Sequence, residues 1–293
     1  LVDEQAEPGG SLLSETDASI DGRSGWDWLK AATDELAAME NVTVLARTTA
    51  IGYYHGNLVG LCQRLTDHIA NPPQGAPRER LWKVRAKQVV LAQGAIEKPL
   101  VFDGNDRPGV MLAGAARAYL NRYGVKVGER PVVVTSHDSA WLAAFDLAEA
   151  GVKVAAIVDV RPEVAAHMKQ RAALLGIEAL TGWTVTGTAG RLRVASVRVN
   201  PVDGGPVDGG MVGPARTIAC DALLMSGGWT PSVHLFSHTK GKLDWHEDGG
   251  MFLPGEPAEA CRCAGAGNGG FGLAAALAEG TAAGAAAAVD AGF

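Results

Sequence analysis

The sequence has 293 residues, of which 47% are hydrophobic and 20% are charged, and its formal net charge at pH 7 is -6. This composition is typical of a globular protein, and the length favours two domains over one. Lysines and arginines form no cluster, so we expect no nucleic-acid partner. Residues 271–289 are apolar but consist mostly of Ala and Gly, with Glu279 and Thr281 among them. They predict a closely packed helix and no membrane span.

The first thirteen residues, LVDEQAEPGGSLL, place two acids before a Gly-Gly pair. In a dinucleotide-binding βαβ unit, an acid at the end of the second strand accepts hydrogen bonds from the adenosine ribose, about 20 residues after a glycine-rich turn. The acid is present here, and the glycine-rich turn before it is not. With no initial Met, the pattern predicts that the first βα unit is truncated and that the sequence is part of a longer protein.

A helix and an antiparallel meander are expected next, because helical spacing of apolar residues gives way to β-rich runs separated by turn residues. In chain order the expected elements are a helix at 26–40, a β-rich run at 42–54, a hairpin turn at Gly56-Asn57, a strand at 58–66, a Pro-rich loop at 71–80 and strands within 81–91. The apolar residues 89–91 lead into the small residues 92–95. This is typical of a buried parallel strand whose end meets a ligand.

A second unit begins at Arg130 with a complete strand–helix–strand pattern: a strand at 132–135, a helix at 139–150 and a strand at 154–158 that ends in Asp159. The turn between the first strand and the helix, TSHDSA, contains no glycine. Side chains there block the close approach of a pyrophosphate, and Asp138 adds a negative charge. We therefore expect no nucleotide in this unit, and Asp138 or Ser139 is better explained as the helix N-cap.

The rest of the chain predicts further alternation of helices and strands. The expected elements are a helix at 163–175, a strand at 178–180, a hairpin at 191–200, a loose turn at 203–213, a strand at 219–226 and, from 261 onward, a strand, a glycine-rich turn and a long helix of small residues. Small residues let that helix approach another backbone or a flat cofactor closely.

Three long stretches carry a family resemblance: residues 89–125 (VVLAQGAIEKPLVFDGNDRPGVMLAGAARAYLNRYGV), residues 225–245 (MSGGWTPSVHLFSHTKGKLDW) and the run AGAGNGGFGLAAALAEG. The order of elements resembles the two-dinucleotide-domain flavoproteins that include thioredoxin and glutathione reductases. The three stretches resemble the alpha subunits of heterotetrameric sarcosine oxidases, and the match covers essentially the whole chain.

The resemblance implies an α/β fold with two Rossmann-like dinucleotide-binding domains, the second inserted in the first, together with a β-meander. The first domain would comprise residues 1–108 and 219–293, and the inserted domain residues 109–218. The chain would be the central nucleotide-binding portion of a larger alpha subunit, whose ferredoxin-like and folate-binding parts lie outside it.

The resemblance also implies an activity and partners. The enzymes it points to are oxidoreductases on CH-NH groups that oxidatively demethylate sarcosine to glycine and form hydrogen peroxide. Electrons pass from a flavin in the beta subunit, through FMN at the alpha–beta interface, to oxygen. Gamma and delta subunits complete the cytoplasmic heterotetramer, tetrahydrofolate binds the C-terminal domain, and the dinucleotide site of the alpha subunit holds NAD.

Three segments contain the candidate cofactor-binding residues, and no residue is expected to be catalytic or to bind a metal. Asp3, with Glu4 as the adjacent alternative, falls at the ribose position, and a strand-end turn is the competing interpretation. For the glycines, the competing interpretations are a plain tight turn at Gly9-Gly10 and close helix packing at 265–269. The full set is Asp3, Glu4, Gly9, Gly10 and Ser11, then Ala92, Gly94 and Ala95 on the adenosine side, and Gly265, Ala266, Asn268 and Gly269 around the phosphates.

Two absences favour a dinucleotide that is held without reacting. Flavin-binding relatives carry Gly-Asp in the last glycine-rich turn, where this sequence has Gly265-Ala266, and no redox C-x-x-C is present. Two alternatives stay open. One is a subunit of a related FAD-dependent amino-acid or opine oxidase or of a cyanide-forming glycine oxidase, and the other is a non-catalytic assembly scaffold. Trp229, Phe236 and Trp245 are candidates for a surface that docks a partner subunit.

Overall fold

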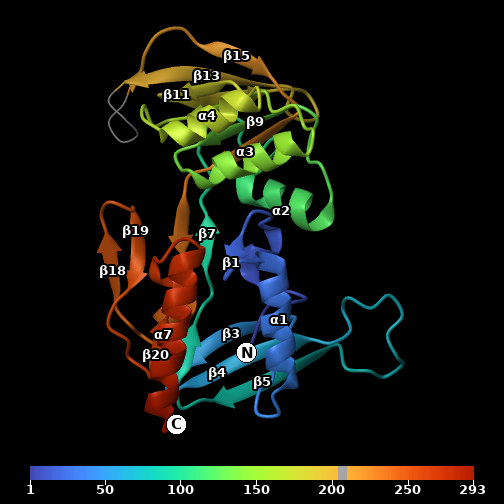
Figure 1. Ribbon diagram of the computed structural model, residues 1–293, viewed down its shortest axis with the longest axis vertical. Helices are drawn as coiled ribbons and strands as arrows, with labels where there is room; N and C mark the ends of the chain where they lie inside the picture. Colours follow the sequence, from blue (N-terminus) through green and yellow to red (C-terminus); the bar gives the residue numbers. More distant parts are fainter. Residues whose placement is uncertain (204–209) are drawn as a thin grey trace. The chain divides into compact units, whose positions relative to one another are not determined.

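The computed structural model describes residues 1–203 and 210–293, which form two compact units (Figure 1). Unit 1 comprises residues 1–12, 17–96 and 230–293, and unit 2 comprises residues 13–16 and 97–229. The chain leaves unit 1 along β7 (Ala95–Glu97) and returns along β17 (Trp229–Pro231), and these two strands pair with each other. Most of the loose turn predicted at 203–213 lies outside the described residues.

Unit 2 is built on a five-stranded sheet with the order β11-β10-β9-β16-β8, in which every pair of neighbouring strands is parallel. Its strands are β8 (Val110–Leu112), β9 (Pro131–Thr135), β10 (Ala156–Asp159), β11 (Ala179–Thr181) and β16 (Ala222–Ser226). The helices are α2 (Ala113–Tyr123), α3 (Ser139–Glu149) and α4 (Ala166–Leu174). The strand–helix–strand pattern predicted from Arg130 onward is therefore present in full.

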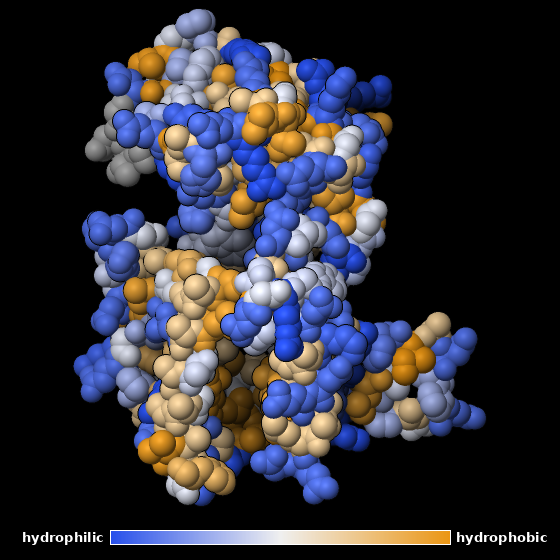
Figure 2. Space-filling view, viewed as in Figure 1, coloured by the Kyte–Doolittle hydropathy of each residue, from blue (hydrophilic) through white to orange (hydrophobic). Residues whose placement is uncertain are grey.

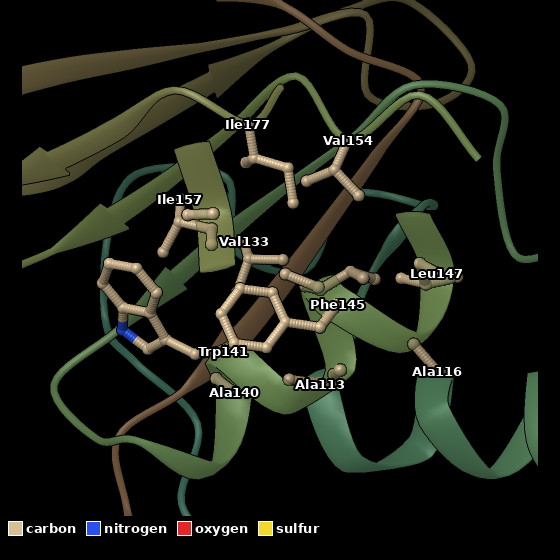
Figure 3. Close-up of a cluster of buried hydrophobic side chains, with 14 of the residues drawn as sticks. Ala113, Ala116, Val133, Ala140, Trp141, Phe145, Leu147, Val154, Ile157 and Ile177 are labelled. Atoms are coloured by element: carbon tan, nitrogen blue, oxygen red, sulfur yellow. The ribbon is translucent and has the colours of Figure 1, made fainter. Parts of the chain in front are cut away.

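Both faces of this sheet are covered. Helices α2, α3 and α4 bury one face around Trp141, Phe145 and Ile157, and Figure 3 shows these side chains pointing toward one another together with Val133 and Ala113. On the other face, Val132, Val134 and Val158 of the sheet pack against β12 (Trp183–Ala189), β13 (Ser196–Asp203) and β15 (Arg216–Ala219). A short strand, β14 (Gly210–Met211), pairs with the end of β13. The sequence predicted the β12–β13 hairpin only in part, at 191–200.

The predicted N-cap of α3 is correct in position, but the capping hydrogen bond is missing. Asp138 stands at the cap position, but its side chain accepts no hydrogen bond from the helix. Its carboxylate instead pairs with Arg161, at 2.7 Å from Nη2. Ser139 is the first residue of the helix, and its hydroxyl accepts from the indole of Trp229 at 3.0 Å. A guanidinium from a neighbouring strand end thus competes successfully with the helix for the carboxylate.

Unit 1 contains a helix and an antiparallel meander, as the sequence predicts. Helix α1 (Gly25–Ala38) begins at Ser24, whose hydroxyl accepts from the backbone N–H of Asp27 at 3.1 Å. The strands β3 (Thr48–Tyr54), β4 (Leu58–Arg64) and β5 (Glu79–Arg85) pair antiparallel. Gly56 and Asn57 both have positive φ, 71° and 52°, which suits a two-residue hairpin.

The parallel strands of unit 1 form only short pairs. β6 (Val89–Leu91) pairs with β20 (Cys261–Cys263), and Val2 forms an isolated parallel bridge with Leu45. The prediction of a buried strand at 89–91 is correct in pairing but wrong in burial, because Leu91 is buried while Val90 is 38% exposed. The remaining elements of unit 1 are η1 (Gly10–Ser14), β1 (Ser19–Ile20), β2 (Arg23–Ser24), α6 (His234–His238), β18 (Leu243–His246), β19 (Met251–Pro254), η2 (Gly265–Asn268) and α7 (Leu273–Ala291).

Candidate functional site

The turns that follow β6 and β20 meet at the carboxyl ends of these two parallel strands. The backbone N–H of Ala264 donates to Leu91 O at 3.0 Å, which aligns the two strand ends. A Cβ added at Gly267 would lie 3.4 Å from Gly94 O and 3.5 Å from Gly94 N. The structure therefore brings the predicted segments 92–95 and 265–269 into contact. The ends of parallel strands in α/β sheets are where such folds bind ligands.

Glu279 of α7 holds the glycine-rich turn in place. Its Oε2 accepts from the backbone N–H of Gly265 at 2.9 Å and from Asn268 Nδ2 at 3.1 Å. Two donors that were predicted to bind cofactor phosphates therefore bind a carboxylate of the protein. Sequence reasoning assigns no role to Glu279, and its one signal is an acid in a helix made almost entirely of Ala and Gly.

Asp3 lies half-buried at the end of the short strand that pairs with Leu45. Its backbone N–H donates to Leu45 O at 2.9 Å, and its Oδ1 accepts from Gln5 N at 2.8 Å. Within the described part of the chain, Gln5 N is the one donor to this carboxylate, so the second oxygen can accept from a ligand. The side chain of the neighbouring Glu4 is exposed, and its carbonyl oxygen accepts from Arg64 Nη2 at 2.9 Å.

Open backbone surrounds several of the predicted glycines. Gly10 has φ 54° and Gly94 has φ 70°, and a Cβ added at either residue would meet no atom within 4 Å. The side chain of Gln93 donates to Ser232 O and so is engaged within the protein. Among the other predicted residues, Ser11 and Ala92 are exposed, and Ala95 and Ala266 are half-buried. Gly9 and Gly269 also have positive φ.

The segment that carries Asp3 is anchored apart from the two turns. The carbonyl oxygen of Asp3 accepts from Thr48 N at 2.8 Å, and that of Gln5 accepts from Arg47 N at 2.7 Å. These bonds attach residues 3–5 to the start of β3. The structure thus brings two of the three predicted segments into contact and holds the third on the meander.

In unit 2, the corresponding strand end is filled by side chains of the protein. His137 Nδ1 accepts from the backbone N–H of Ser139 at 3.3 Å and lies 3.1 Å from Ser139 Oγ, at the start of α3. Trp229 Nε1 donates to the same hydroxyl. Burial lowers the pKa of His137, which favours the neutral imidazole that such acceptance requires. The helix N-terminus, where a pyrophosphate would bind, is therefore occupied by an imidazole and an indole.

The acid at the end of β10, Asp159, is also fully hydrogen-bonded within the protein. Asp159 is fully buried, and its two carboxylate oxygens accept from Trp141 Nε1, from the backbone N–H of Arg161 and from the Arg161 guanidinium, at 2.7–3.0 Å. The hydrogen bond to this carboxylate, together with its negative charge, raises the pKa of Arg161 above its ordinary value. Asp159 thus has no free acceptor for a ribose hydroxyl.

The other titratable side chains form no second reactive centre among the described residues. His55 Nδ1 lies 2.9 Å from Glu259 Oε1, but its side chain is fully exposed. All four cysteines are free, and burial raises the pKa of Cys220 to about 11 and that of Cys263 to about 12, which keeps both thiols protonated. The described residues contain no group of His, Cys, Asp and Glu suited to a metal ion. None of the helices described is long and apolar enough to cross a membrane.

The three aromatic residues predicted to dock a partner have different environments. Phe236 is 2% exposed and belongs to the core of unit 1 with Tyr53 and Leu91, so that prediction is wrong for Phe236. Trp229 is half-buried and bound to Ser139. Trp245 is 52% exposed and packs edge-on against Phe252, with ring centroids 5.0 Å apart. Of the three, Trp245 alone remains a candidate for an exposed contact.

Comparison with solved structures defines the fold class. No family model matches the chain. The thioredoxin reductase of Lactococcus lactis aligns with a TM-score of 0.70 at 15% identity, covering 99% of this chain and 89% of that one. The chain therefore has an α/β fold that resembles the thioredoxin reductase-like two-dinucleotide-domain flavoproteins, with parallel sheets.

Comparison with curated sequences narrows this class. The chain is 45% identical over 282 residues to the sarcosine oxidase alpha subunit of Rhizobium meliloti (strain 1021), and 43% identical over 298 residues to that of Corynebacterium sp. (strain P-1). These matches cover 96% and 100% of the chain but only 27% and 30% of the two relatives. An opine oxidase subunit of Agrobacterium tumefaciens (strain Ach5) is 28% identical over 273 residues, which is 87% of the chain and 52% of that relative. The chain is thus a homologue of part of the sarcosine oxidase alpha subunit.

Proposed function

We propose that the chain is the dinucleotide-binding portion of the alpha subunit of a sarcosine oxidase-like enzyme, and that unit 1 holds NAD. The enzyme would demethylate sarcosine oxidatively to glycine and release hydrogen peroxide. The observation that carries the proposal is the contact between the turns after β6 and β20 in a homologue of sarcosine oxidase alpha subunits. This contact sits at the strand ends where dinucleotides bind in such folds.

Each segment of the site would have a separate role in holding the dinucleotide. The free carboxylate oxygen of Asp3 would accept from the adenosine ribose, as acids at this position do in related folds. Gly10 and Gly94 leave backbone open to close approach, which a pyrophosphate and an adenosine require. Glu279 would act through the turn by fixing Gly265 and Asn268, without touching the ligand.

The small residue at position 266 supports NAD over FAD. Ala266 lies in η2, between the glycines that form the turn, and has no carboxylate to bind the hydroxyls of a ribitol chain. NAD supplies hydride-transfer chemistry where it reacts. Among the described residues of the site, the two acids are assigned to binding, Asp3 to the ribose and Glu279 to the turn, and the thiols of Cys261 and Cys263 have raised pKa values. The bound dinucleotide would therefore stabilise the subunit rather than react.

Unit 2 would contribute no second nucleotide site. Its strand ends are occupied by His137, Trp229 and the Asp159–Arg161 pair. A nucleotide would have to break a buried charge pair and displace an indole, and both losses are costly. We therefore expect one dinucleotide for each alpha subunit.

The remaining parts of the enzyme would come from outside the chain. The proposal includes beta, gamma and delta subunits in a cytoplasmic heterotetramer, FMN at the interface with the beta subunit, and tetrahydrofolate on another domain of the alpha subunit. The basis is that the chain matches only 27% and 30% of the length of two sarcosine oxidase alpha subunits. The amine substrate would bind the subunit that carries the catalytic flavin.

Paired substitutions at neighbouring acids test the ribose assignment. The full subunit carrying Asp3→Ala should bind NAD at least about tenfold more weakly than the parent, because the loss of a charged hydrogen-bond acceptor costs about 1.5–3 kcal/mol. Glu4→Ala should bind like the parent, since the Glu4 side chain is exposed. Isothermal titration of both variants after removal of the bound nucleotide measures this. The reverse pattern would assign the ribose to Glu4, and no loss in either variant would remove this segment from the site.

A second candidate function is a subunit of an FAD-dependent oxidase of the opine type. The similarity to the opine oxidase subunit of Agrobacterium tumefaciens favours it. In that case the full subunit would be yellow, with flavin absorbance that remains after the other subunits are removed. An isolated subunit with neither flavin nor NAD would instead support a non-catalytic scaffold.

A further inference from the structure

Three carboxylic side chains are buried in the described part of the chain, whereas the face shown in Figure 2 is rich in hydrophilic residues over both units. Two of the three are paired with a cation: Asp146 with Arg117, and Asp159 with Arg161. Glu97 is only 6% exposed, and none of the charged side chains described acts on its carboxyl group. A buried carboxylate without a cation is costly, so Glu97 differs from the other two.

Glu97 lies at the N-terminus of α2, within unit 2. It is the last residue of β7, and its Oε2 accepts from the backbone N–H of Gly114, in the first turn of the helix, at 2.9 Å. A Cβ added at Gly114 would lie 2.7 Å from this oxygen, so the glycine leaves the room that the carboxyl group occupies. The residue at the cap position, Leu112, makes no side-chain hydrogen bond to the helix. The carboxyl group of Glu97 therefore caps α2 from a different element.

Two buried polar side-chain atoms of the described residues have no hydrogen-bond partner, and both belong to this position. They are Glu97 Oε1 and Ser226 Oγ. Ser226 is the fully buried last residue of β16, and its hydroxyl is the side-chain group that interacts with the Glu97 carboxyl. An ionised carboxyl group only accepts hydrogen bonds, whereas a protonated one also donates. A proton on Oε1 would therefore supply a donor to the Ser226 hydroxyl and leave Oε2 as the acceptor for Gly114.

We propose that the N-terminus of α2 is a proton-binding site, in which Glu97 is uncharged at neutral pH and donates its proton to Ser226 Oγ. The site acts as a pH-sensitive latch: loss of the proton places an unpaired charge inside unit 2 and loosens the first turn of α2. Rising pH rather than falling pH therefore opens it. The inference holds whichever cofactor unit 1 binds.

The surroundings of Glu97 favour the uncharged form. Burial raises the pKa of Glu97 above its ordinary value, and this effect exceeds the opposite effects of the Ser226 hydroxyl and the Gly114 N–H. The partial positive charge at a helix N-terminus favours ionisation, but by less than the burial of a carboxyl group disfavours it.

The elements around the carboxyl group supply no cation that would stabilise the ionised form. Strands β16 and β17 contain no charged residue. The first charged residue of α2, Arg117, is paired with Asp146. Lys98 follows Glu97 in the chain, but its side chain extends toward Gly228. A proton is therefore the one positive charge that the described residues leave room for at Glu97.

Thermal unfolding of the full subunit with Glu97→Gln tests the proposal, because glutamine has the shape of the neutral acid and also donates to a hydroxyl. As the pH rises through about 4.5, the ordinary pKa of a glutamate, the unfolded parent loses a proton that the folded parent keeps. The parent therefore loses stability relative to the variant until the folded carboxyl group ionises as well. We expect the melting temperature of Glu97→Gln to rise relative to that of the parent by on the order of 2–4 °C over this range.

Glu259→Gln is the matched control and should show the opposite trend. The Glu259 carboxylate accepts from the backbone N–H groups of Gly56 and Asn57, and these hydrogen bonds lower its pKa. The melting temperature of Glu259→Gln should therefore fall relative to that of the parent as the pH rises. The proposal is overturned if Glu97→Gln follows the trend of Glu259→Gln, or if its difference from the parent does not change with pH.

Infrared difference spectra of the folded full subunit give a second readout that does not depend on unfolding. A protonated carboxyl group has a C=O stretching band that shifts in D2O, and an ionised group lacks this band. The band should be present at neutral pH, disappear in Glu97→Gln and change frequency in Ser226→Ala, which removes the proposed acceptor. If Glu97→Gln does not fold, the difference between the parent and Ser226→Ala still reports the band. Absence of the band from the parent would contradict the proposal, and a band that Ser226→Ala leaves unchanged would exclude Ser226 as the acceptor.

Discussion

Helices α3 and α7 have similarly apolar sequences but opposite environments. Seven of the 11 residues of α3 are buried, from Ala140 to Leu147, whereas one of the 19 residues of α7 is buried. Unit 2 supplies α3 with a sheet and a neighbouring helix, whereas in unit 1 α7 lies against the short strands β6 and β20 and the glycine-rich turn η2. An apolar sequence alone therefore does not determine how deeply a helix is buried, and α7 keeps exposed apolar residues such as Val289.

The two units also differ in whether side chains of the protein close the ends of their strands. In unit 2 they are closed by His137, Trp229 and the Asp159–Arg161 pair. In unit 1 they are open at Gly10, Gly94 and Asp3. The unit with the complete core is thus the one without room for a ligand. We therefore propose that the dinucleotide binds in unit 1, where the strand ends are not closed by side chains of the protein.

The largest expected effect comes from the core of unit 2. Trp141→Ala removes a fully buried ring and one donor to Asp159, and should lower the free energy of unfolding by about 3–5 kcal/mol. Leu277→Ala in the half-buried face of α7 is the matched change in unit 1 and should cost less than about 1.5 kcal/mol. Urea denaturation of both variants measures the difference. Equal losses would mean that α7 is as well packed as α3.

Breaking the buried charge pair of unit 2 should have the next largest effect. Arg161→Met leaves the Asp159 carboxylate buried with two donors, from Trp141 and the backbone, and should destabilise the fold by about 3 kcal/mol. Arg216→Met breaks an exposed pair with Glu178 and should cost at most about 1 kcal/mol. Thermal unfolding of the two variants gives the comparison. A loss as small for Arg161 as for Arg216 would show that Asp159 is hydrated.

In unit 1, Glu279→Ala should loosen the glycine-rich turn. The change frees the Gly265 N–H and the Asn268 amide and should cost about 1–2 kcal/mol, because both donors lose their acceptor. Hydrogen exchange at the Gly265 amide reports the loss directly. Asp290→Ala, which removes an acid from the same helix that pairs with Arg262, is the control and should leave that amide protected. Unchanged exchange in Glu279→Ala would rule out the role given to Glu279.

The smallest expected effect is a pH dependence in unit 2. Burial lowers the pKa of His137 in the folded state below its usual value of about 6.5. As the pH falls through 6.5, the unfolded chain takes up a proton before the folded chain does, so the free energy of unfolding decreases until the folded pKa is reached. His137→Gln, which stays neutral and keeps an acceptor for Ser139 N, should flatten this slope. An equal slope in parent and variant would assign the pH dependence to other groups.

Local patterns predicted the elements of the fold well. The helix expected at 26–40 forms as Gly25–Ala38, and the helix expected at 139–150 after the glycine-free turn forms as Ser139–Glu149. Strand β12 was missed because its Gly and Thr residues weaken the alternation of polar and apolar side chains. The burial of β6 was overestimated because an apolar strand reveals nothing about how many strands flank it.

Contacts between distant residues could not be read from the sequence. Glu279 accepts hydrogen bonds from Gly265, 14 residues earlier, and from Asn268, 11 residues earlier. No sequence motif has this spacing, so the contact could not be predicted. The capture of Asp138 by Arg161 and the burial of Phe236 depend on which elements pack together. The residue assignments of the dinucleotide site rest on the acid before Gly9-Gly10 and on the family resemblance, and they remain predictions.

One measurement bears on the whole interpretation: acid release of the nucleotide from the purified full-length protein, identified by absorbance and mass and counted per polypeptide. We expect one NAD per polypeptide and no FAD, with the count lowered in Asp3→Ala and retained in Glu4→Ala. Release of FAD, or of two nucleotides per polypeptide, would contradict the assignment of a single NAD to the open strand ends of unit 1.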